Sequence, residues 1–287
     1  MLQATKLRCV GVDLATALRS AVKEVLQYLR GSSVRTDVLG SSYFGDVTRV
    51  FDRVAEELIV SSLIKRLGRK LLIVSEEMGV KAVGEPEYIA VIDPVDGSTN
   101  YEAGIPWSSV SIAIAPYNDK AVIKDVQAAI VAEVFRDRVY EFSEESGVKV
   151  NGLRPSRPSK PLEVLLGYFE TPEAYSIIPG YWGVRGGRVA LRSLGCVSLD
   201  IIYVALGRAE GFADLRAKIR NVDVAASIAI AEELGAKSIL CNGVPASEVT
   251  IKNLVKIDCL LVGFNEYYLG RLVKAFKLRR SLSAHSQ

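Results

Sequence analysis

The spacing of apolar residues along the chain predicts an alternation of helices and strands. Apolar residues near positions 11–30 recur every three or four residues, which is the interval of an amphipathic helix. They are Leu14, Leu18, Val22, Val25 and Leu29. A second stripe with this interval lies within residues 45–67 and predicts a second helix. Its members are Val47, Val50, Phe51, Val54 and Leu58. The glycine- and serine-rich residues 31–45 are expected to separate the two helices.

Short apolar runs predict the strands. Two of them, within residues 71–79 and 88–97, end in acidic residues. This profile is typical of a buried strand that delivers side chains to a site at its C-terminal end. Further strands are expected at 110–116, 128–135, 138–144, 164–169 and 210–215. The remaining helices are expected at 198–207, 222–235 and 266–276.

Interleaved helices and strands predict mixed α/β layers. A polar, proline-bearing stretch, VNGLRPSRPSKP, interrupts the pattern at residues 150–161. We interpret it as the hinge between an N-terminal α+β subdomain, residues 1–160, and a C-terminal α/β subdomain, residues 161–287. A chain of 287 residues with 49% hydrophobic residues can bury a large core in such an arrangement.

The composition narrows the classes of function. The net charge is only +3, with acidic and basic residues mixed, so nucleic acid is not expected as the main partner. No apolar run reaches the roughly 20 residues of a membrane helix, and the N-terminus lacks the pattern of a signal peptide, so we expect a cytoplasmic protein without a membrane partner. The single histidine, His285, lies in a polar tail, which excludes Ser-His-Asp triads and histidine-rich zinc sites.

The four cysteines, Cys9, Cys196, Cys241 and Cys259, show no CxxC spacing. We therefore expect buried free thiols rather than a metal knot or a disulfide framework. With histidine and cysteine set aside, carboxylates and hydroxyls remain for any chemistry. Oxygen ligands favour Mg²⁺ or Mn²⁺.

The segment VIDPVDGSTNY, residues 91–101, carries two aspartates three positions apart around a proline. Because neighbouring carboxylates repel one another, Asp93 and Asp96 indicate a bound cation. The glycine, serine and threonine that follow provide backbone and hydroxyl donors for an anion. The segment therefore predicts a metal-dependent phosphate enzyme.

Other acidic residues have structural interpretations as well. Glu76 and Glu77 also suit an ordinary charged loop, although they directly follow a predicted buried strand. Asp223 opens an apolar helix and suits a helix cap. Haloacid dehalogenase-type phosphatases are excluded, because their two aspartates are separated by two positions and here Asp93 and Asp96 are separated by three.

Three segments together resemble the inositol monophosphatase and fructose-1,6-bisphosphatase superfamily, in its archaeal dual-activity type. They are SEEMG, IDPVDGSTNYEAGIPWSSVSIAI and NVDVAASIAIAEELGA. The second is similar to the family signature DPxDGTxN, and the third to WDxAAGxxIxxEAGG, with Val222 in place of Trp and Ser227 in place of Gly. The resemblance covers roughly residues 10–265 in the family's order. It implies an αβαβα layered sandwich and a Mg²⁺-dependent phosphomonoesterase.

The resemblance also implies the metal ligands. Glu76, Asp93 and the carbonyl of Val95 would hold a first Mg²⁺, and Asp93, Asp96 and Asp223 a second. Glu76 would also contact a third, weaker ion, and Mn²⁺ is a possible substitute. Two Mg²⁺ ions would neutralise the four carboxylates, and one of them would lower the pKa of the attacking water.

Further roles follow from the same resemblance. Glu76, Ser98 and Asp52 would be catalytic, with Ser98 and Asp52 orienting the attacking water. Gly97, Ser98 and Thr99 would present N–H groups and hydroxyls to the phosphate at a helix start.

The substrate is less well defined by the sequence. Arg216 stands where animal inositol monophosphatases have a glutamate that contacts the inositol ring, and an arginine prefers an anion. It favours a substrate with a second negative group, such as fructose 1,6-bisphosphate, and the alternative is a surface ion pair. Arg192, Gly195 and Cys196 occupy the family's sugar-facing segment and are expected to bind substrate.

Inositol 1-phosphate and fructose 1,6-bisphosphate are thus the expected substrates. Alternatives are 3′-phosphoadenosine 5′-phosphate and a catalytically weak regulatory or binding protein that keeps the fold. The complete set of acidic residues argues against the last. A homodimer is suggested by the family alone.

Overall fold

The computed structural model describes residues 13–31, 34, 36–41 and 47–283. Its first helix, α1 (Leu14–Leu29), confirms the predicted helix, and its apolar stripe is buried except for Leu14, which is half-buried. Asp13 caps the helix by accepting a hydrogen bond from the N–H of Thr16. Two short antiparallel strands follow. Strand β1 (Val38–Ser41) lies in the predicted break, and β2 (Val47–Arg49) lies where the sequence predicted the start of the second helix, so Val47 of the predicted stripe is not helical.

The second helix, α2 (Val50–Leu67), buries a different face from the predicted one. Val54 and Leu58 are only half-buried. The buried apolar positions of α2 are Phe51, which belongs to the predicted stripe, and Ala55, Ile59, Val60, Leu63 and Leu67, which do not. The helix packs against α1 and the sheet beneath both. The predicted stripe was therefore wrong by part of a turn.

A seven-stranded sheet forms the centre of the N-terminal half, in the order β4-β3-β5-β6-β7-β8-β9. All its pairs are antiparallel except β3 with β5. Its strands are β3 (Lys70–Ser75), β4 (Gly79–Gly84), β5 (Tyr88–Asp96), β6 (Ser109–Pro116), β7 (Ala128–Glu133), β8 (Val139–Ser143) and β9 (Gly147–Val150). A short helix, α3 (Ser98–Glu102), follows β5, and a 3₁₀ turn at Ile123–Asp125 precedes β7.

A second, five-stranded sheet lies in the C-terminal half, in the order β11-β10-β12-β16-β14. Its strands are β10 (Val164–Tyr168), β11 (Ala190–Arg192), β12 (Gly211–Asp214), β14 (Lys237–Leu240) and β16 (Leu260–Gly263). The short strands β13 (Ile219–Arg220) and β15 (Lys256–Ile257) pair separately. The helices are α4 (Pro172–Tyr175), α5 (Ile177–Arg185), α6 (Val197–Ala205), α7 (Asn221–Glu233) and α8 (Glu266–Ser283), with a 3₁₀ turn at Ala246–Glu248.

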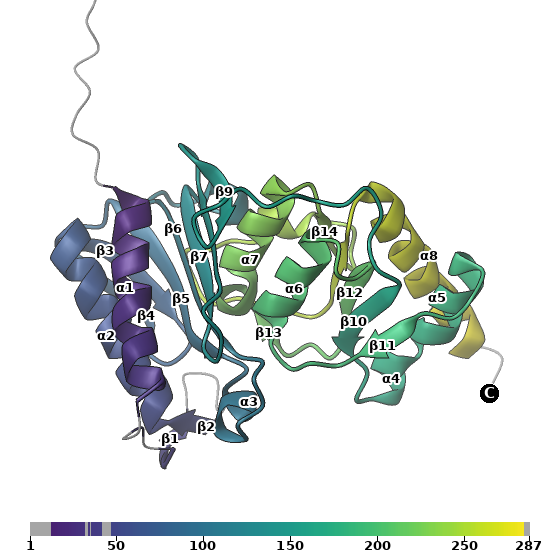
Figure 1. The fold of residues 1–287 in the computed structure, drawn as a ribbon, viewed down its shortest axis with the longest axis horizontal. Coiled ribbons are helices and arrows are strands. Elements are labelled where there is room, and N and C mark those ends of the chain that lie inside the picture. The colour runs from purple at the N-terminus through teal and green to yellow at the C-terminus, as the bar shows by residue number, and fades with distance from the viewer. Residues whose placement is uncertain (1–12, 32–33, 35, 42–46, 284–287) are drawn as a thin grey trace, which may run out of the picture.

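The helices and sheets form five layers (Figure 1). Helices α1 and α2 cover one face of the seven-stranded sheet, and α6 and α7 lie between the two sheets. Helices α5 and α8 cover the outer face of the second sheet. This arrangement confirms the predicted αβαβα sandwich. The two sheets fall on either side of residue 160, and the subdomain boundary there stays a prediction.

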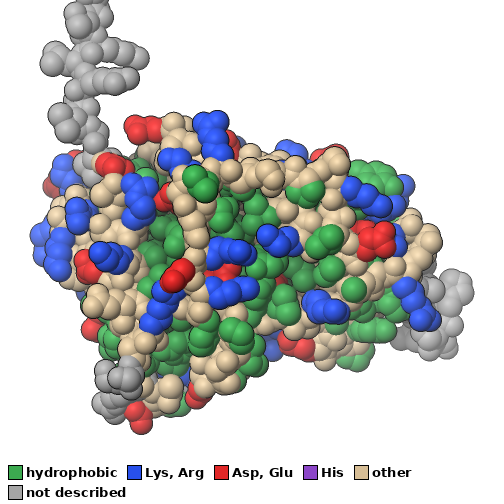
Figure 2. Space-filling model, in the orientation of Figure 1, with side chains coloured by type: hydrophobic (Ala, Val, Ile, Leu, Met, Phe, Trp, Pro, Cys, Tyr) green, Lys and Arg blue, Asp and Glu red, His purple; other side chains and the backbone are tan. Residues whose placement is uncertain are grey.

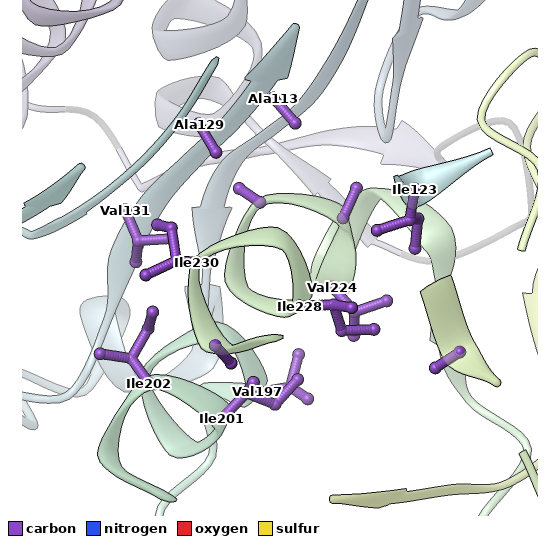
Figure 3. Packing of buried hydrophobic residues seen from close by; sticks show 14 of the residues in the cluster. Ala113, Ile123, Ala129, Val131, Val197, Ile201, Ile202, Val224, Ile228 and Ile230 are labelled. Carbon is purple, nitrogen blue, oxygen red and sulfur yellow. The ribbon is translucent and has the colours of Figure 1, made fainter. Parts of the chain in front are cut away.

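The middle layer joins the two halves through a continuous apolar core. Figure 3 shows Val131 on the seven-stranded sheet close to Ile230 of α7, with Ile202 of α6 nearby. All three side chains are almost completely removed from solvent. Burial of apolar side chains of this size stabilises a protein by about 1.5–3 kcal/mol each. The position of α7, and of any side chain at its start, is therefore fixed against both sheets.

The cysteine prediction was partly wrong. Cys241 and Cys259 form a disulfide with a Cα–Cα distance of 5.5 Å. Cys241 directly follows β14 and Cys259 directly precedes β16, and these antiparallel strands pair Leu240 with Leu260, so the two cysteines lie opposite one another. Cys196 is a buried free thiol, as expected, and Cys9 lies outside the described residues.

Reduction of this disulfide is expected to lower the melting temperature. The bond closes a loop with a sequence separation of 18 residues, and a loop of this size contributes about 3 kcal/mol in the chain-entropy account. Melting curves with and without dithiothreitol would measure the effect, about 5 °C or more. The double variant Cys241→Ser/Cys259→Ser is the control, because its curve has no bond to lose. A wild-type curve that does not respond to the reductant would contradict the assignment.

The charged side chains do not gather into one patch on the face shown in Figure 2, where Lys and Arg alternate with Asp, Glu and apolar groups. Within the part of the chain that the structure describes, no helix combines the length and the apolar character needed to cross a bilayer.

Candidate active site

A bulge in β5 brings Asp93 and Asp96 to one edge of the sheet. In a regular strand, residues three positions apart point to opposite faces. Here Asp93 pairs with Ser111 and Asp96 with Ser109, so β5 has one residue more than β6 between the two pairs. Such a bulge shifts the alternation by one residue. Pro94 lies within it, where a missing N–H costs no ladder hydrogen bond.

Three acidic side chains meet beside this bulge. Strands β3 and β5 are parallel and pair Ser75 with Ile92, so the residues that follow, Glu76 and Asp93, lie side by side. The start of α7 contributes Asp223. One carboxylate oxygen from each of Glu76, Asp93 and Asp223 lies within 4.8 Å of the others. Three carboxylates at this spacing form a donor set suited to a hard divalent cation.

Burial and mutual repulsion raise the pKa values of these acids. Burial is the largest cause for Asp93, followed by the charge of Glu76, and its pKa lies well above the usual range. The pKa of Glu76 is raised by burial and then by the charge of Asp223. Burial raises the pKa of Asp223 to about 7, although the backbone N–H of Arg220 partly opposes this shift. The cluster therefore holds more negative charge than the protein alone compensates.

Arg220 supplies part of the missing positive charge. Its Nη1 contacts Oε1 of Glu76 at 3.0 Å, and its backbone N–H donates to Oδ2 of Asp223 at 2.8 Å. The N-cap residue of α7 is Arg220 and not Asp223, which lies at the third position of the helix and accepts a hydrogen bond from the N-cap backbone N–H. The acidic cluster and the helix start share the side chain of Asp223.

Asp96 faces the start of α6 and is not part of the three-acid cluster. Its carboxylate accepts hydrogen bonds from the backbone N–H groups of Val197 and Ser198, at 3.2 and 2.6 Å. The Ser198 hydroxyl and the Cys196 thiol also donate to it. The positive end of the α6 dipole favours a carboxylate there. The role of Asp96 as a metal ligand stays a prediction.

Asp52 and Ser98 flank the acids. Asp52 lies in the first turn of α2 and is almost completely buried. Burial, and then the charge of Glu77, raise the pKa of Asp52 to about 8. Ser98 begins α3 and is half-buried.

Gly97 and Gly195 allow two loops to approach one another closely beside α3. Gly97 has φ of 78°, and a Cβ there would lie 2.8 Å from the carbonyl oxygen of Gly195. Asn100 crosslinks the same loops by donating to the carbonyls of Trp107 and Leu194 at 2.8 and 2.7 Å. The first-turn N–H groups of α3 have no acceptor within the helix. The two halves of the chain therefore meet beside the start of α3, whose N–H groups remain available to an acceptor.

A cavity of about 430 Å³ opens beside these groups. Asp96 and Asp223 line it, together with Thr99, Gly195 and Arg216 from the predicted substrate-binding set. Two other members of that set lie elsewhere. Arg192 is exposed at the end of β11 and donates to the carbonyl of Leu191, and Cys196 is buried behind Asp96.

A second cavity, of about 580 Å³, lies between α1 and the strands β7 and β8. Its lining includes the apolar side chains of Val22, Leu26 and Ile130. None of the acidic residues of the cluster contributes to it. We take the smaller cavity as the candidate active site because Asp223 of the acidic cluster, Asp96 and residues from both halves of the chain line it.

Sequence reasoning missed three residues of this site. Arg220, Asn100 and Glu170 all contact or line it. Asn100 could have been identified from the DGSTN segment. Arg220 could have been identified from its position three residues before Asp223. Glu170 has no local sequence signal, because only the pairing of β10 with β12 brings it to the cavity.

Comparisons with known proteins show the family to which this chain is similar. The profile of the inositol monophosphatase family matches residues 4–268. An inositol-1-monophosphatase from Aeropyrum pernix is 34% identical over 248 residues, 85% of this chain and 88% of the relative. A fructose-1,6-bisphosphatase/inositol-1-monophosphatase from Thermococcus kodakarensis is 30% identical over 267 residues, 92% and 96% of the two chains. A solved Pyrococcus horikoshii protein, described as similar to inositol-1 monophosphatase, has a TM-score of 0.69 at 26% identity and covers 91% of this chain and 95% of its own.

Proposed function

The chain belongs to the inositol monophosphatase family, and from this premise we propose that it is a Mg²⁺-dependent phosphatase for inositol 1-phosphate and fructose 1,6-bisphosphate. It is a phosphoric monoester hydrolase that acts on sugar or inositol phosphates. The observation that carries the proposal is the buried cluster of Glu76, Asp93 and Asp223 beside the start of α3.

The donor set fits a hard divalent cation. Its three carboxylates lie close together and largely away from solvent, which raises their pKa values. The guanidinium of Arg220 neutralises only one of their negative charges. Oxygen-only ligands favour Mg²⁺, with Mn²⁺ as a substitute, over zinc or copper. We assign Glu76, Asp93 and the Val95 carbonyl to one ion, and Asp93, Asp96 and Asp223 to a second. Bound ions of this kind polarise phosphoryl oxygens and make water more acidic.

The residues of the chain then hold and orient the reactants. Asp52, in the first turn of α2, and Ser98, at the start of α3, would position the attacking water. The carboxyl group of Asp52 would accept a hydrogen bond from that water or exchange a proton with it. The N–H groups and hydroxyls of Gly97, Ser98 and Thr99 would bind the phosphate, since the dipole of a helix start favours an anion.

Phosphate release tests the proposal. The purified chain would be stripped with EDTA and assayed with a panel of inositol 1-phosphate, fructose 1,6-bisphosphate and 3′-phosphoadenosine 5′-phosphate. We expect release from the first two only when Mg²⁺ is added. Release from the nucleotide alone would favour the nucleotide phosphatase. No release from any substrate at saturating Mg²⁺ or Mn²⁺ would favour a binding protein that keeps the fold.

Glu56 positions the loop that carries Glu76. Its side chain lies on α2, is completely buried, and accepts hydrogen bonds from the N–H groups of Glu77 and Met78 at 3.3 and 3.1 Å. We therefore expect Glu56→Ala to raise the Mg²⁺ concentration for half-maximal activity by about tenfold or more, as for other residues that support metal ligands. Glu56→Gln keeps an acceptor oxygen and is expected to stay close to the wild type. Equal Mg²⁺ dependence in the alanine variant and the wild type would contradict this role.

Two further expectations concern the protein as a whole. A homodimer and a cytoplasmic location both stay predictions. Sedimentation equilibrium of the purified chain would test the first.

A further inference from the structure

A charged trio, Asp214, Arg216 and Glu170, lies on the side of the candidate active site that the C-terminal half provides. Strands β10 and β12 are parallel neighbours and pair Tyr168 with Asp214. The residues that follow each strand therefore emerge at the same edge, with Glu170 after β10 and Arg216 after β12. Glu170 and Arg216 both line the cavity that contains Asp96 and Asp223.

The guanidinium group of Arg216 is occupied by protein partners. Its Nη2 donates to Oδ2 of Asp214 at 2.7 Å, and its Nη1 donates to Oε2 of Glu170 at 3.0 Å. It also lies over the ring of Tyr168, 3.8 Å from the ring centre. The side chain is only 14% exposed. Arg216 is therefore a half-buried arginine held in two ion pairs, which agrees with the ion-pair alternative better than with a free anion ligand.

The trio carries a net negative charge. Two carboxylates face one guanidinium, and Asp214 is buried at 1% exposure while Glu170 is 51% exposed. A second phosphate on the substrate would meet the carboxylate of Glu170 before it reached Arg216, and like charges repel. A hydroxyl group can instead donate to the open lone pairs of the Glu170 carboxylate, which accepts several hydrogen bonds.

We propose that Glu170 is a specificity-determining residue that accepts hydrogen bonds from the hydroxyls of a phosphorylated polyol and disfavours substrates with a second phosphate. Asp214 and Arg216 are positioning residues that hold Glu170 in place. This inference rests on the proposed phosphatase function and refines its substrate class. It reverses the interpretation of Arg216 as a ligand for a second anion.

The test compares kcat/KM for inositol 1-phosphate and fructose 1,6-bisphosphate in the wild type and in Glu170→Gln. We expect the variant to shift the ratio toward the bisphosphate by about tenfold, with most of the change in the KM of the bisphosphate, because one repelling charge is lost. Glu170→Asp keeps the charge and is expected to keep the wild-type ratio. Glu173→Gln is the matched control, because it removes an exposed carboxylate of α4 that does not line the cavity.

An unchanged ratio in Glu170→Gln would overturn the inference. An equal loss on both substrates would also overturn it, since Glu170 would then support the fold, and a melting curve of the variant would show that loss. Failure of the phosphatase assignment has a different signature, because the wild type would then release no phosphate from either substrate at any Mg²⁺ concentration.

Discussion

Asp93→Asn is expected to reduce Mg²⁺-dependent phosphate release by about 10³-fold or more while the protein stays folded. Asp93 belongs to the acidic cluster with Glu76 and Asp223, and we assign it to both metal ions. Loss of a shared ligand removes several kcal/mol of transition-state stabilisation, and about 4 kcal/mol corresponds to this change in rate. The rate would be measured as phosphate release at saturating Mg²⁺.

The fold is expected to survive this substitution. The Asp93 carboxylate accepts a hydrogen bond from the N–H of Val95 at 3.1 Å, and the amide oxygen of asparagine can accept the same bond. The neutral amide also relieves repulsion from Glu76 and Asp223, so the metal-free variant should melt at the same temperature as the metal-free wild type, or higher. Asp137→Asn is the control, because Asp137 is 93% exposed and does not belong to the acidic cluster. Wild-type turnover in Asp93→Asn would disprove its assignment to the metal ions.

Mg²⁺ is expected to raise the melting temperature, and more so at about pH 8 than at about pH 5. A ligand that binds only the native state, at a free concentration about 100-fold above its Kd, stabilises that state by about 2.7 kcal/mol. This corresponds to a shift of about 5 °C or more for a chain of this size. Protons compete with the metal for the same carboxylates, so the shift should shrink as the pH falls.

The stability of the metal-free protein should fall as the pH rises, whereas the stabilisation by Mg²⁺ should grow. The native pKa values of Asp52 and Asp223 are raised to about 8 and about 7, whereas unfolded aspartates titrate near 4. The native state therefore binds more protons than the unfolded state between these values, and its stability falls as the pH rises from about 4 to about 8. Melting curves in EDTA across this range would show the decline. A melting temperature that does not change with pH would contradict a buried cluster of mutually repelling carboxylates. Equal Mg²⁺-induced shifts of the melting temperature at both pH values would contradict it as well.

The local pattern of the sequence predicted the long elements well. Helices α1 and α7 and the buried strands β5 and β6 have strong periodic or continuous apolar signals. The short strands β11, β14 and β16 were missed, because strands of three or four residues have too little pattern to separate them from loops. The α2 face was misassigned, since the neighbours that bury Ala55 in place of Val54 are distant in sequence.

The acidic residues of the candidate site were visible in the sequence, and their partners were not. Glu76, Asp93 and Asp223 each follow or open an apolar element, so a pattern of strand ends and helix starts points to them. The bonds from Val197 and Ser198 to Asp96 join residues about a hundred positions apart. The pairing of Arg216 with Glu170 joins residues 46 positions apart and depends on the register of two strands. Long-range register is what the sequence pattern alone leaves open.

Diffraction from crystals grown with Mn²⁺ tests the central claim, that Glu76, Asp93 and Asp223 hold a divalent metal ion, most directly. Anomalous difference density identifies Mn²⁺ independently of the surrounding atoms, and Mn²⁺ is an accepted substitute for Mg²⁺ at oxygen sites. We expect an anomalous peak bonded to carboxylate oxygens of all three residues, with the Arg220 guanidinium displaced from Glu76. The absence of such a peak at saturating Mn²⁺, with Arg220 still paired to Glu76, would contradict the account.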